Sequence, residues 1–569
     1  MYRPVLDAVG GSLALTSIFA ALPLLTLFVL LGALRMRAWV AALISLGVAV
    51  VVAVLVYSMP VGQTLLAGTE GAAFGFFPIL WIVINAIWVY NMTVTTGHFD
   101  VLRRSFGKIS DDQRIQGVII AFSFGALLEA LAGFGTPVAI TSVMLIALGF
   151  KPIKAATVAL VANTAPVAFG ALAVPITTLA TVSGLPQQDL GSMVGRQTPI
   201  LGVFVPMALV FIIDRGRGVR QTLPATIVCG VVFALTQFLT SNFLSVPLTD
   251  IVAALASAVA VVLVLRVWHP AQTYTEALET MAAGSAGSSA RGRASASGGG
   301  DHPIGQGTGT MDELAARDAV AVDTRADVLR AYSPYLIIIA VFVVAQIPAI
   351  KDALDSVTRS FTWPGLDLQT AGGKPSTLPV FKVNWLAAAG TLMILSGLFT
   401  IPVIGIKPRD AMRAMGATYR QLATAIVTVM AVLGLAYVMN SSGQTATLGA
   451  WMAGAGAAFA IMSPILGWLG VAVTGSDTSS NSLFGALQVT AAGQAGLDPL
   501  LMAASNSSGG VLGKMISPQN LAIACAAVGM SGREGDLFRR VIGWSLGFLA
   551  FMCVLVFLQS TPVLSWMVP

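Results

Sequence analysis

Charged residues, histidine and cysteine are all scarce in this chain of 569 residues. Only 10% of the residues are Asp, Glu, Lys or Arg, whereas soluble domains carry about a quarter, so most of the chain cannot face water. The three histidines and three cysteines show no metal-ligand spacing and no paired-cysteine pattern. We therefore expect no cofactor, no bound metal ion and no enzymatic activity. The net charge of +6 does not require a nucleic-acid partner, because Lys and Arg in loops also orient membrane helices.

Long apolar runs occupy most of the remaining sequence, and 56% of the residues are hydrophobic. A helix needs roughly 20 apolar residues to cross a bilayer, and runs of this kind recur at 13–34, 38–56, 222–239, 247–265, 385–404, 422–439 and 541–558. Helices satisfy their backbone hydrogen bonds internally, as lipid requires. The sequence thus predicts an all-α polytopic protein of the lipid bilayer with about 12 to 14 membrane segments.

One polar stretch divides these segments into two groups. Residues 269–331 include GSAGSSARGRASASGGG (284–300), whose Gly and Ser content is typical of a flexible linker. We expect an N-terminal membrane half at 1–268 and a C-terminal membrane half at 332–569. Basic residues after the first and third spans predict that the linker is cytoplasmic and the N-terminus external. The topology after residue 441 stays open by one crossing, and the oligomeric state is also open.

Each half contains one segment of unusual length. The segments 117–150 and 464–498 are too long for one straight span and too short for two spans with a turn. A re-entrant hairpin of two half-length helices fits both, with tips at 133–137 and in TGSDTSSN (474–481). Because non-helical backbone at membrane depth is tolerated only inside protein or along a wet cavity, we expect both tips to border a substrate site.

A helix interrupted by Gly and Pro follows each hairpin, at 155–182 and at 499–530. The stretch ANTAPVAFGALAVP (162–175) aligns without a gap with residues of the second interrupted helix. The aligned pairs are Asn163 with Asn506, Thr164 with Ser507, and Ala171 with Lys514. Broken helices in corresponding positions of two halves are typical of transporter sites, because half-helix N-termini attract anions and unwound carbonyl groups attract cations. The pattern predicts two repeats, each with a hairpin and a broken helix.

Three charged residues lie well inside these segments, away from their ends: Glu129, Asp477 and Lys514. A charge at bilayer depth costs several kcal/mol unless it is paired or hydrated. We expect Lys514 to bind an anionic substrate group, with a permanent ion pair to an acid such as Asp477 as the alternative. Glu129 or Asp477 would carry a proton, and Glu129 is preferred because its apolar neighbours favour the neutral form. Glu70 and Asp250 lie near the ends of helices and are expected at the membrane interface.

Small polar side chains complete the expected site, although such residues in membrane helices often serve packing alone. The expected substrate-binding residues, besides Lys514, are Asn163, Thr164, Asn506, Ser507, Ser508, Ser476 and Thr478.

Several of these stretches resemble the bacterial L-lactate permease family. The resemblance is carried by LLEALAGFGTPVAI, NTAPVAFGA, LGWLGVAVTGSDTSSNSLFGALQ and GGVLGKMISPQNLAIACAAVG, and it extends over nearly the whole chain. It implies an inner-membrane symporter that moves L-lactate, and often D-lactate and glycolate, with protons, in a fold of two inverted repeats. Sodium-coupled symport of organic anions stays open as the alternative, because Ser, Thr and Asn side chains with free carbonyl groups also make a sodium site.

Overall fold

The computed structural model describes residues 2–107, 109–131, 133, 135–275, 323–345, 347–369, 375–376 and 378–569. Ten helices in this part of the chain are long and apolar enough to cross a membrane, or eleven if one bent helix pair counts as a span. The prediction of a polytopic helical membrane protein is therefore confirmed. The Gly/Ser-rich tract 284–300 lies outside the described residues, so its role as a linker stays a prediction.

The helices before the linker run as follows. They are α1 (Leu13–Phe28), α2 (Ala38–Leu55), α3 (Val61–Phe74), α4 (Trp81–Thr95), α5 (His98–Gly107), α6 (Gln113–Gly117), α7 (Gly125–Leu131), α8 (Thr136–Ala147), α9 (Pro152–Ala162), α10 (Gly170–Ser183), α11 (Gln187–Val194), α12 (Thr198–Leu239) and α13 (Thr249–Val267). Short π or 3-10 turns used below are η3 (Val118–Phe124), η4 (Val167–Phe169), η5 (Thr240–Leu244) and η6 (Val246–Leu248).

After the linker the chain is again mostly helical. The helices are α16 (Arg325–Ala345), α17 (Pro348–Asp355), α18 (Ala389–Ile404), α19 (Pro408–Ser442), α20 (Gln444–Met452), α21 (Phe459–Thr474), α22 (Asp477–Ala495), α23 (Pro499–Gly513), the 3-10 turn η8 (Lys514–Ile516), α24 (Pro518–Ala527) and α25 (Glu534–Gln559). One antiparallel pair of strands, β1 (Arg359–Thr362) and β2 (Val380–Val383), precedes α18, with Arg359 opposite Val383. The sequence analysis did not anticipate these strands.

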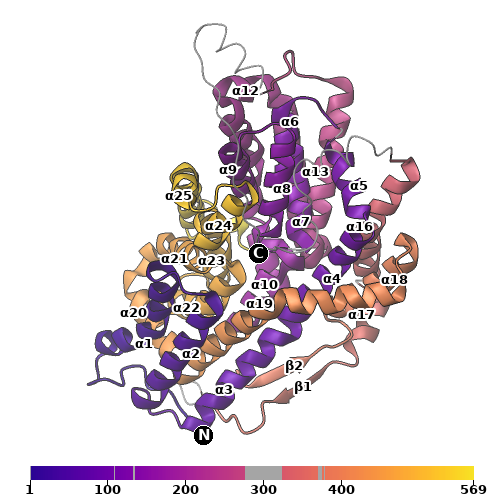
Figure 1. The fold of residues 1–569 in the computed structure, drawn as a ribbon. Coiled ribbons are helices and arrows are strands. Elements are labelled where there is room, and N and C mark those ends of the chain that lie inside the picture. The colour runs from indigo at the N-terminus through magenta and orange to yellow at the C-terminus, as the bar shows by residue number, and fades with distance from the viewer. Residues whose placement is uncertain are drawn as a thin grey trace.

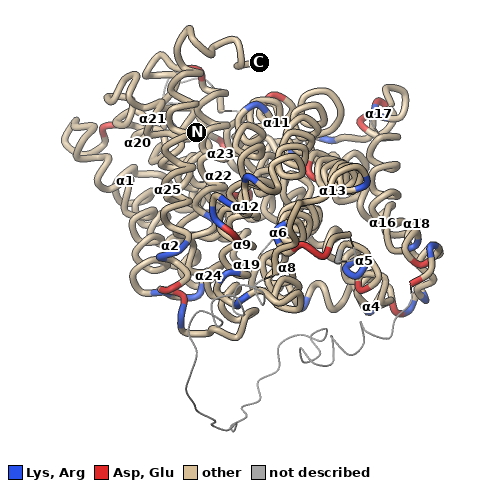
Figure 2. The backbone as a smooth tube through the Cα atoms, turned by 90° about the horizontal axis from the view of Figure 1, so that it is seen from above, with Lys and Arg blue, Asp and Glu red and all other residues tan. Residues whose placement is uncertain are grey.

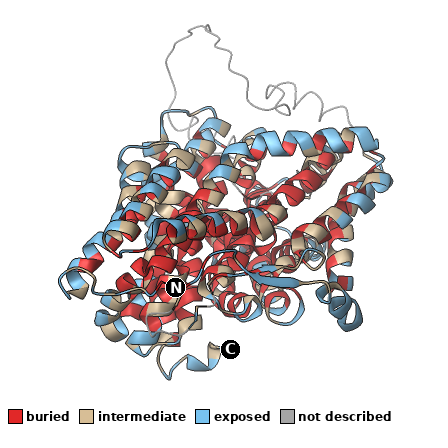
Figure 3. Ribbon diagram, turned by 90° about the horizontal axis from the view of Figure 1, so that it is seen from below, coloured by how far each residue is buried: buried red, intermediate tan, exposed pale blue. Residues whose placement is uncertain are grey.

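Helices from both sides of the linker pack against each other (Figure 1). The first helices α1 and α2 contact α20 and α19, while α4 and α5 contact α18 and α16. Buried residues concentrate in the centre, where these groups meet, and exposed residues lie at the periphery (Figure 3). Only a third of the apolar window of α1 is buried, which suits a helix that faces lipid. Charged residues take up few positions along the tube (Figure 2).

Helix α12 is a hairpin of two antiparallel helices rather than one rod. Its 42 residues would extend about 63 Å at 1.5 Å per residue, about twice the thickness of a bilayer core. Asp214 and Arg215 leave the helical region, with φ of −137° and 51°. Gly230, which follows this turn, lies against the backbone of Val203, which precedes it. A Cβ atom on Gly230 would collide with that backbone. One of the ten candidate spans therefore folds back on itself.

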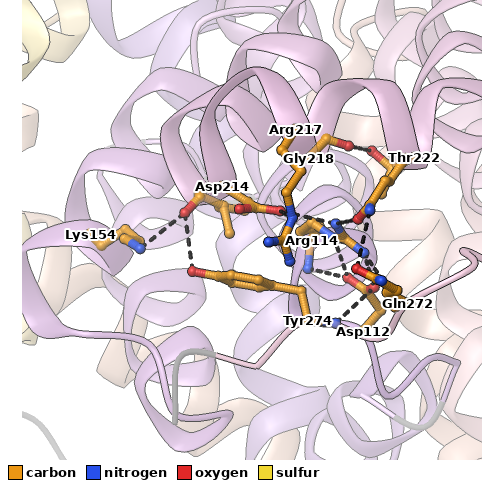
Figure 4. Close-up of polar contacts among 11 residues, drawn as sticks. Asp112, Arg114, Lys154, Asp214, Arg217, Gly218, Thr222, Gln272 and Tyr274 are labelled. Atoms are coloured by element: carbon orange, nitrogen blue, oxygen red, sulfur yellow. Dashed lines mark hydrogen bonds and ion pairs between the residues drawn. The ribbon is translucent and has the colours of Figure 1, made fainter. Parts of the chain in front are cut away.

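A buried arginine fixes this turn (Figure 4). Arg114, at the start of α6, donates from Nη2 to Asp112 Oδ2 at 2.7 Å and from Nη1 to Asp214 Oδ2 at 3.0 Å. Nη1 also donates to Gln221 Oε1 at 2.6 Å, and the guanidinium carbon lies 5.6 Å from the centre of the Tyr274 ring. The cluster ties α6 and the α12 turn to Gln272 and Tyr274 at the start of the polar stretch, so we interpret it as structural.

The two expected hairpins are formed by helices that meet at glycine turns. In the first, α6, η3 and α7 lead to the tip and α8 returns, and Gln113 Nε2 donates to the Leu148 carbonyl at 2.7 Å where the two ends meet. Gly135 at this tip has φ of 83°, a backbone conformation that residues other than glycine rarely adopt. In the second, α21 and α22 meet at Gly475, with φ of 76°. That these hairpins are re-entrant, and that the halves are repeats, stays a prediction.

The helices after the hairpins are both interrupted, the first over a longer stretch than the second. The first bends by 64° between α9 and η4, directly after Asn163. The second stays helical through Asn506 and is interrupted only at Lys514, where α23 gives way to η8. The Ser/Asn-rich run is therefore helical. Ser505, Asn506 and Ser507 form hydrogen bonds with side chains of neighbouring helices, while Ser508 Oγ has no hydrogen-bond partner.

Candidate functional site

A pocket of about 1110 Å³ lies between the two hairpin tips and the second broken helix. Glu129 from α7, Asp477 from α22 and Lys514 from η8 all line it. It extends outward to the exposed residues Arg35 and Arg37 in the loop between α1 and α2. All three charged residues that the sequence analysis selected thus border one cavity.

Lys514 and Glu129 form a buried ion pair in this pocket. Lys514 Nζ donates to Glu129 Oε1 at 2.6 Å, and the exposed fractions of the two side chains are only 7% and 4%. The pair joins residues 385 positions apart in the chain, one on the first hairpin and one on the second broken helix. The expected alternative partner, Asp477, does not form it. Among the described residues, one of the three Nζ donors has a partner, which leaves donors for an incoming carboxylate.

Two glycines, Gly133 and Gly170, leave space for the Glu129 carboxylate because they have no side chain. A Cβ atom at Gly170 would lie 2.8 Å from Oε1, and one at Gly133 would lie 3.7 Å from it. On the other side, Asn163 Nδ2 donates to Glu129 Oε2 at 2.9 Å, while Asn163 Oδ1 has no hydrogen-bond partner. Asn163 therefore contributes to the site by orienting Glu129 and does not line the pocket itself.

The backbone beside Glu129 has an unusual conformation. Ala171, Leu172 and Ala173 at the start of α10 have φ of 45°, 58° and 60°. Left-handed backbone costs roughly 1–2 kcal/mol per residue outside glycine, and such strain is concentrated at functional sites. Ala171, the residue aligned with Lys514, lines the pocket, and its Cβ atom lies 3.6 Å from the position that a Cβ of Gly133 would take.

Asp477 occupies the first position of α22, where the helix dipole favours a carboxylate. Its Oδ2 accepts from Ser507 Oγ at 2.6 Å and from Asn481 Nδ2 at 3.4 Å. Its Oδ1 is buried without a hydrogen-bond partner. Ser476 caps the helix by accepting from the Ser479 N–H at 3.2 Å. Ser476 and Thr478 line the pocket beside Asp477.

A network of amide side chains lies behind the second hairpin. Asn506 Nδ2 donates to Asn481 Oδ1 at 2.9 Å, and Gln488 Nε2 donates to Asn506 Oδ1 at 3.1 Å. Asn481 Nδ2 in turn reaches the Pro175 carbonyl of the first broken helix at 3.1 Å. Asn506 thus uses its polar groups to join helices and does not line the pocket. Asn481 was not selected from the sequence, although its position one turn after Asp477 places both on the same helix face.

The expected site residues fall into two groups, those that line the pocket and those that do not. The expected site residues that line the pocket are Glu129, Ser476, Asp477, Thr478 and Lys514, and those that do not are Asn163, Thr164, Asn506, Ser507 and Ser508. Thr164 donates to the Val161 carbonyl within its own helix at 2.7 Å. Ser508 Oγ is buried without a partner.

Two acids expected at the membrane interface are enclosed by protein. Glu70 and Asp250 are both fully buried, and their depth in the membrane stays a prediction. Glu70 lies on α3, which packs along α19, and the first turn of α13, with Asp250, is packed against η5, η6 and α12. Sequence position near the end of a helix does not show whether another segment covers that end.

Ten candidate spans around a buried charged pocket between helical hairpins define a polytopic membrane protein of the transporter class. The family model for L-lactate permease matches residues 16–563, and the chain belongs to this family. It is 41% identical over 588 residues to the L-lactate permease of Bacillus subtilis (strain 168), covering 100% of this chain and 99% of that one.

Two further proteins are similar to this chain, one in sequence and one in structure. The glycolate permease GlcA of Escherichia coli (strain K12) is 40% identical over 575 residues, which cover 98% of this chain and 97% of that one. The structure of Neisseria gonorrhoeae MtrF, from work on a class of antimetabolite efflux pumps, matches with a TM-score of 0.47 at 13% identity, covering 94% and 97% of the two chains. At that score the superposition carries no functional information. The family and the candidate spans together identify a multi-pass protein of the bacterial plasma membrane.

Proposed function

We propose that this protein is a secondary active transporter that carries L-lactate and related 2-hydroxy monocarboxylates, including D-lactate and glycolate, together with protons. The relatives named L-lactate permease and glycolate permease, which match nearly the whole chain, support the substrate class. The observation that carries the coupling mechanism is the buried ion pair between Lys514 and Glu129 in the pocket.

This pair supplies both elements that a proton–monocarboxylate symporter needs. In the empty site the Lys514 ammonium and the Glu129 carboxylate neutralise each other. When Glu129 takes up a proton, it no longer neutralises Lys514, and the carboxylate of lactate takes its place. The Lys514–Glu129 pair and its substrate again sum to zero, because they comprise one ammonium, one carboxylate and a neutral Glu129. Lactate entering without the proton would bury an extra negative charge, which low-dielectric surroundings disfavour strongly.

Electroneutral movement also removes the opposition of the membrane potential. A lactate anion crossing alone against a negative interior would cost about 2.3 kcal/mol per 100 mV. Uptake with one proton is instead driven by the pH gradient and the lactate gradient.

The other residues of the pocket take supporting roles. The N-terminus of α22, with Ser476 and Thr478, offers N–H and hydroxyl groups to the carboxylate and the 2-hydroxyl group of the substrate. Asp477, held by Ser507, is the second candidate for the proton. Since the pocket extends to Arg35 and Arg37, and basic loops are cytoplasmic, we infer that this conformation is open to the cytoplasm.

Reconstitution in proteoliposomes tests this function. Labelled lactate should accumulate under an inward proton gradient, without sodium, and at a rate that does not change when the membrane potential is clamped at different values. Empty liposomes and liposomes at equal pH are the controls. Uptake that requires Na⁺ and ignores a pH step would overturn proton coupling and support the sodium-coupled alternative.

A further inference from the structure

A second buried acid lies behind the pocket, in contact with a glutamine. Asp250 and Gln237 are both fully buried, on α13 and α12. Gln237 Nε2 donates to Asp250 Oδ1 at 2.9 Å and also approaches the carbonyl of Ala165 at 3.4 Å. The two remaining oxygens, Asp250 Oδ2 and Gln237 Oε1, have no hydrogen-bond partner. An orphaned acceptor on each member of a bonded pair needs an explanation.

One proton on Asp250 gives both unpaired oxygens a hydrogen bond. A protonated carboxyl group is a donor as well as an acceptor, so a proton on Asp250 Oδ2 can be donated to Gln237 Oε1 while Nε2 donates back to Oδ1. An ionised Asp250 would instead be a buried charge with one neutral partner, an arrangement that proteins avoid. The pair therefore has the composition of a neutral acid–amide pair.

The pair is connected to the ion pair in the pocket. The Ala165 carbonyl that Gln237 approaches lies two residues from Asn163, which donates to Glu129. Helix α7, which carries Glu129, packs on α13, which carries Asp250. Asn163 Oδ1, also orphaned, can hold an ordered water between the two acids.

Other charges do not face this position closely. The elements η3, η5, η6 and α10, which also pack on α13, contain no charged residue. Helix α16 packs on α13 as well and bears its charges, Arg325, Asp327 and Arg330, in its first turns. The charges of α12 lie around its turn, at Asp214, Arg215, Arg217 and Arg220.

We propose that Asp250 is a second proton-binding residue of the transporter, which exchanges its proton with Glu129 through water at the break of the first broken helix. When Asp250 Oδ2 passes its proton to Glu129, Asp250 takes up the transported proton from water, so that Lys514 is released for a substrate carboxylate without a net buried charge. The reverse transfer, with release of one proton to water, restores the ion pair. This inference rests on the proposed function.

Asp250→Asn provides the test, because asparagine can keep both hydrogen bonds with Gln237 but has no proton to release. In proteoliposomes, lactate–lactate exchange at equal pH should stay within about twofold of wild type, while net uptake driven by a pH gradient should fall more than about tenfold. Net uptake should become less dependent on pH in this variant. Asp250→Glu should restore part of that pH dependence. Glu70→Gln, which removes another fully buried acid, is the matched control and should keep the wild-type pH profile.

Infrared spectroscopy provides a reading that does not depend on transport. Wild-type protein should show a protonated-carboxyl band that disappears on alkaline titration, is absent in Asp250→Asn and shifts in Asp250→Glu. Any of three results would overturn the proposal. Asp250→Asn could show net uptake at the wild-type rate, or it could lose exchange and net uptake equally with lowered thermal stability. The third result is the absence of a protonated-carboxyl band in the wild-type protein. If wild type itself ignores the pH gradient, the proposed function fails, and the infrared band still decides whether Asp250 holds a proton.

Discussion

Lys514→Ala separates a structural ion pair from a substrate-binding residue. The Lys514 side chain is only 7% exposed, and its ammonium contacts Glu129 at 2.6 Å. Truncation therefore leaves the Glu129 carboxylate buried with Asn163 as its remaining side-chain partner. Breaking a buried pair in this way destabilises proteins by about 3 to 5 kcal/mol, unless the abandoned acid takes up a proton.

Removing both charges at once distinguishes the two roles. Lys514→Met combined with Glu129→Leu replaces the pair by apolar groups of similar volume, a change that is often neutral for stability. We expect the double variant to recover most of the thermal stability that Lys514→Ala loses. It should nevertheless bind lactate more weakly by about 3 kcal/mol, roughly two orders of magnitude in Kd, because no cation remains for the carboxylate.

The assay combines lactate titration of purified protein with thermal unfolding of the same samples. Lys514→Arg is the conservative control, and it should restore binding only in part because a planar fork replaces a point charge. Normal lactate binding by Lys514→Ala, or by the stable double variant, would refute the assignment. The ion pair would then be structural, and the N-termini of the half-helices would hold the anion.

Three further changes test other parts of the argument. Glu129→Gln, which resembles the protonated acid, should abolish pH-driven lactate accumulation in proteoliposomes but retain some lactate exchange; full accumulation would eliminate Glu129 as the proton carrier. Deletion of residues 284–300 should leave transport essentially intact, because such a Gly/Ser-rich tract loses too much entropy on ordering to hold a site; an inserted but inactive deletion variant would contradict this. Arg114→Leu should lower thermal stability by about 3 kcal/mol or more, because Asp112 and Asp214 lose their buried partner, and unchanged unfolding would contradict the cluster's structural role.

The positions of the membrane charges and of the hairpin turns were accessible from the sequence. Apolar length and the cost of a buried charge single out Glu129, Asp477 and Lys514. The turn at Gly135 follows from a backbone conformation that glycine tolerates best. These inferences depend on local chemistry, which a sequence contains directly.

Pairings between distant elements were not accessible in the same way. Two acids were available for Lys514, and only the packing of the first hairpin against the second broken helix selects Glu129. The partners of Asn506 were likewise not accessible, because the amides that it contacts lie on another helix. The burial of Asp250 depends on neighbouring segments that cover the end of α13. Each of these features is set by tertiary contacts.

The difference between the two halves bears on how many anions the site can hold. Each hairpin brings one acid to the pocket, Glu129 or Asp477, but only the second broken helix brings a cation. At the aligned position the first broken helix has Ala171 in a left-handed conformation, and its small side chain leaves space beside Gly133 and Glu129. A second lysine there would neutralise both acids permanently or admit a second carboxylate. In the proposed mechanism Lys514 neutralises one anion at a time, and Glu129 gives up its place to that anion. One cation shared between a resident and a transported carboxylate is thus sufficient to link one proton to one monocarboxylate.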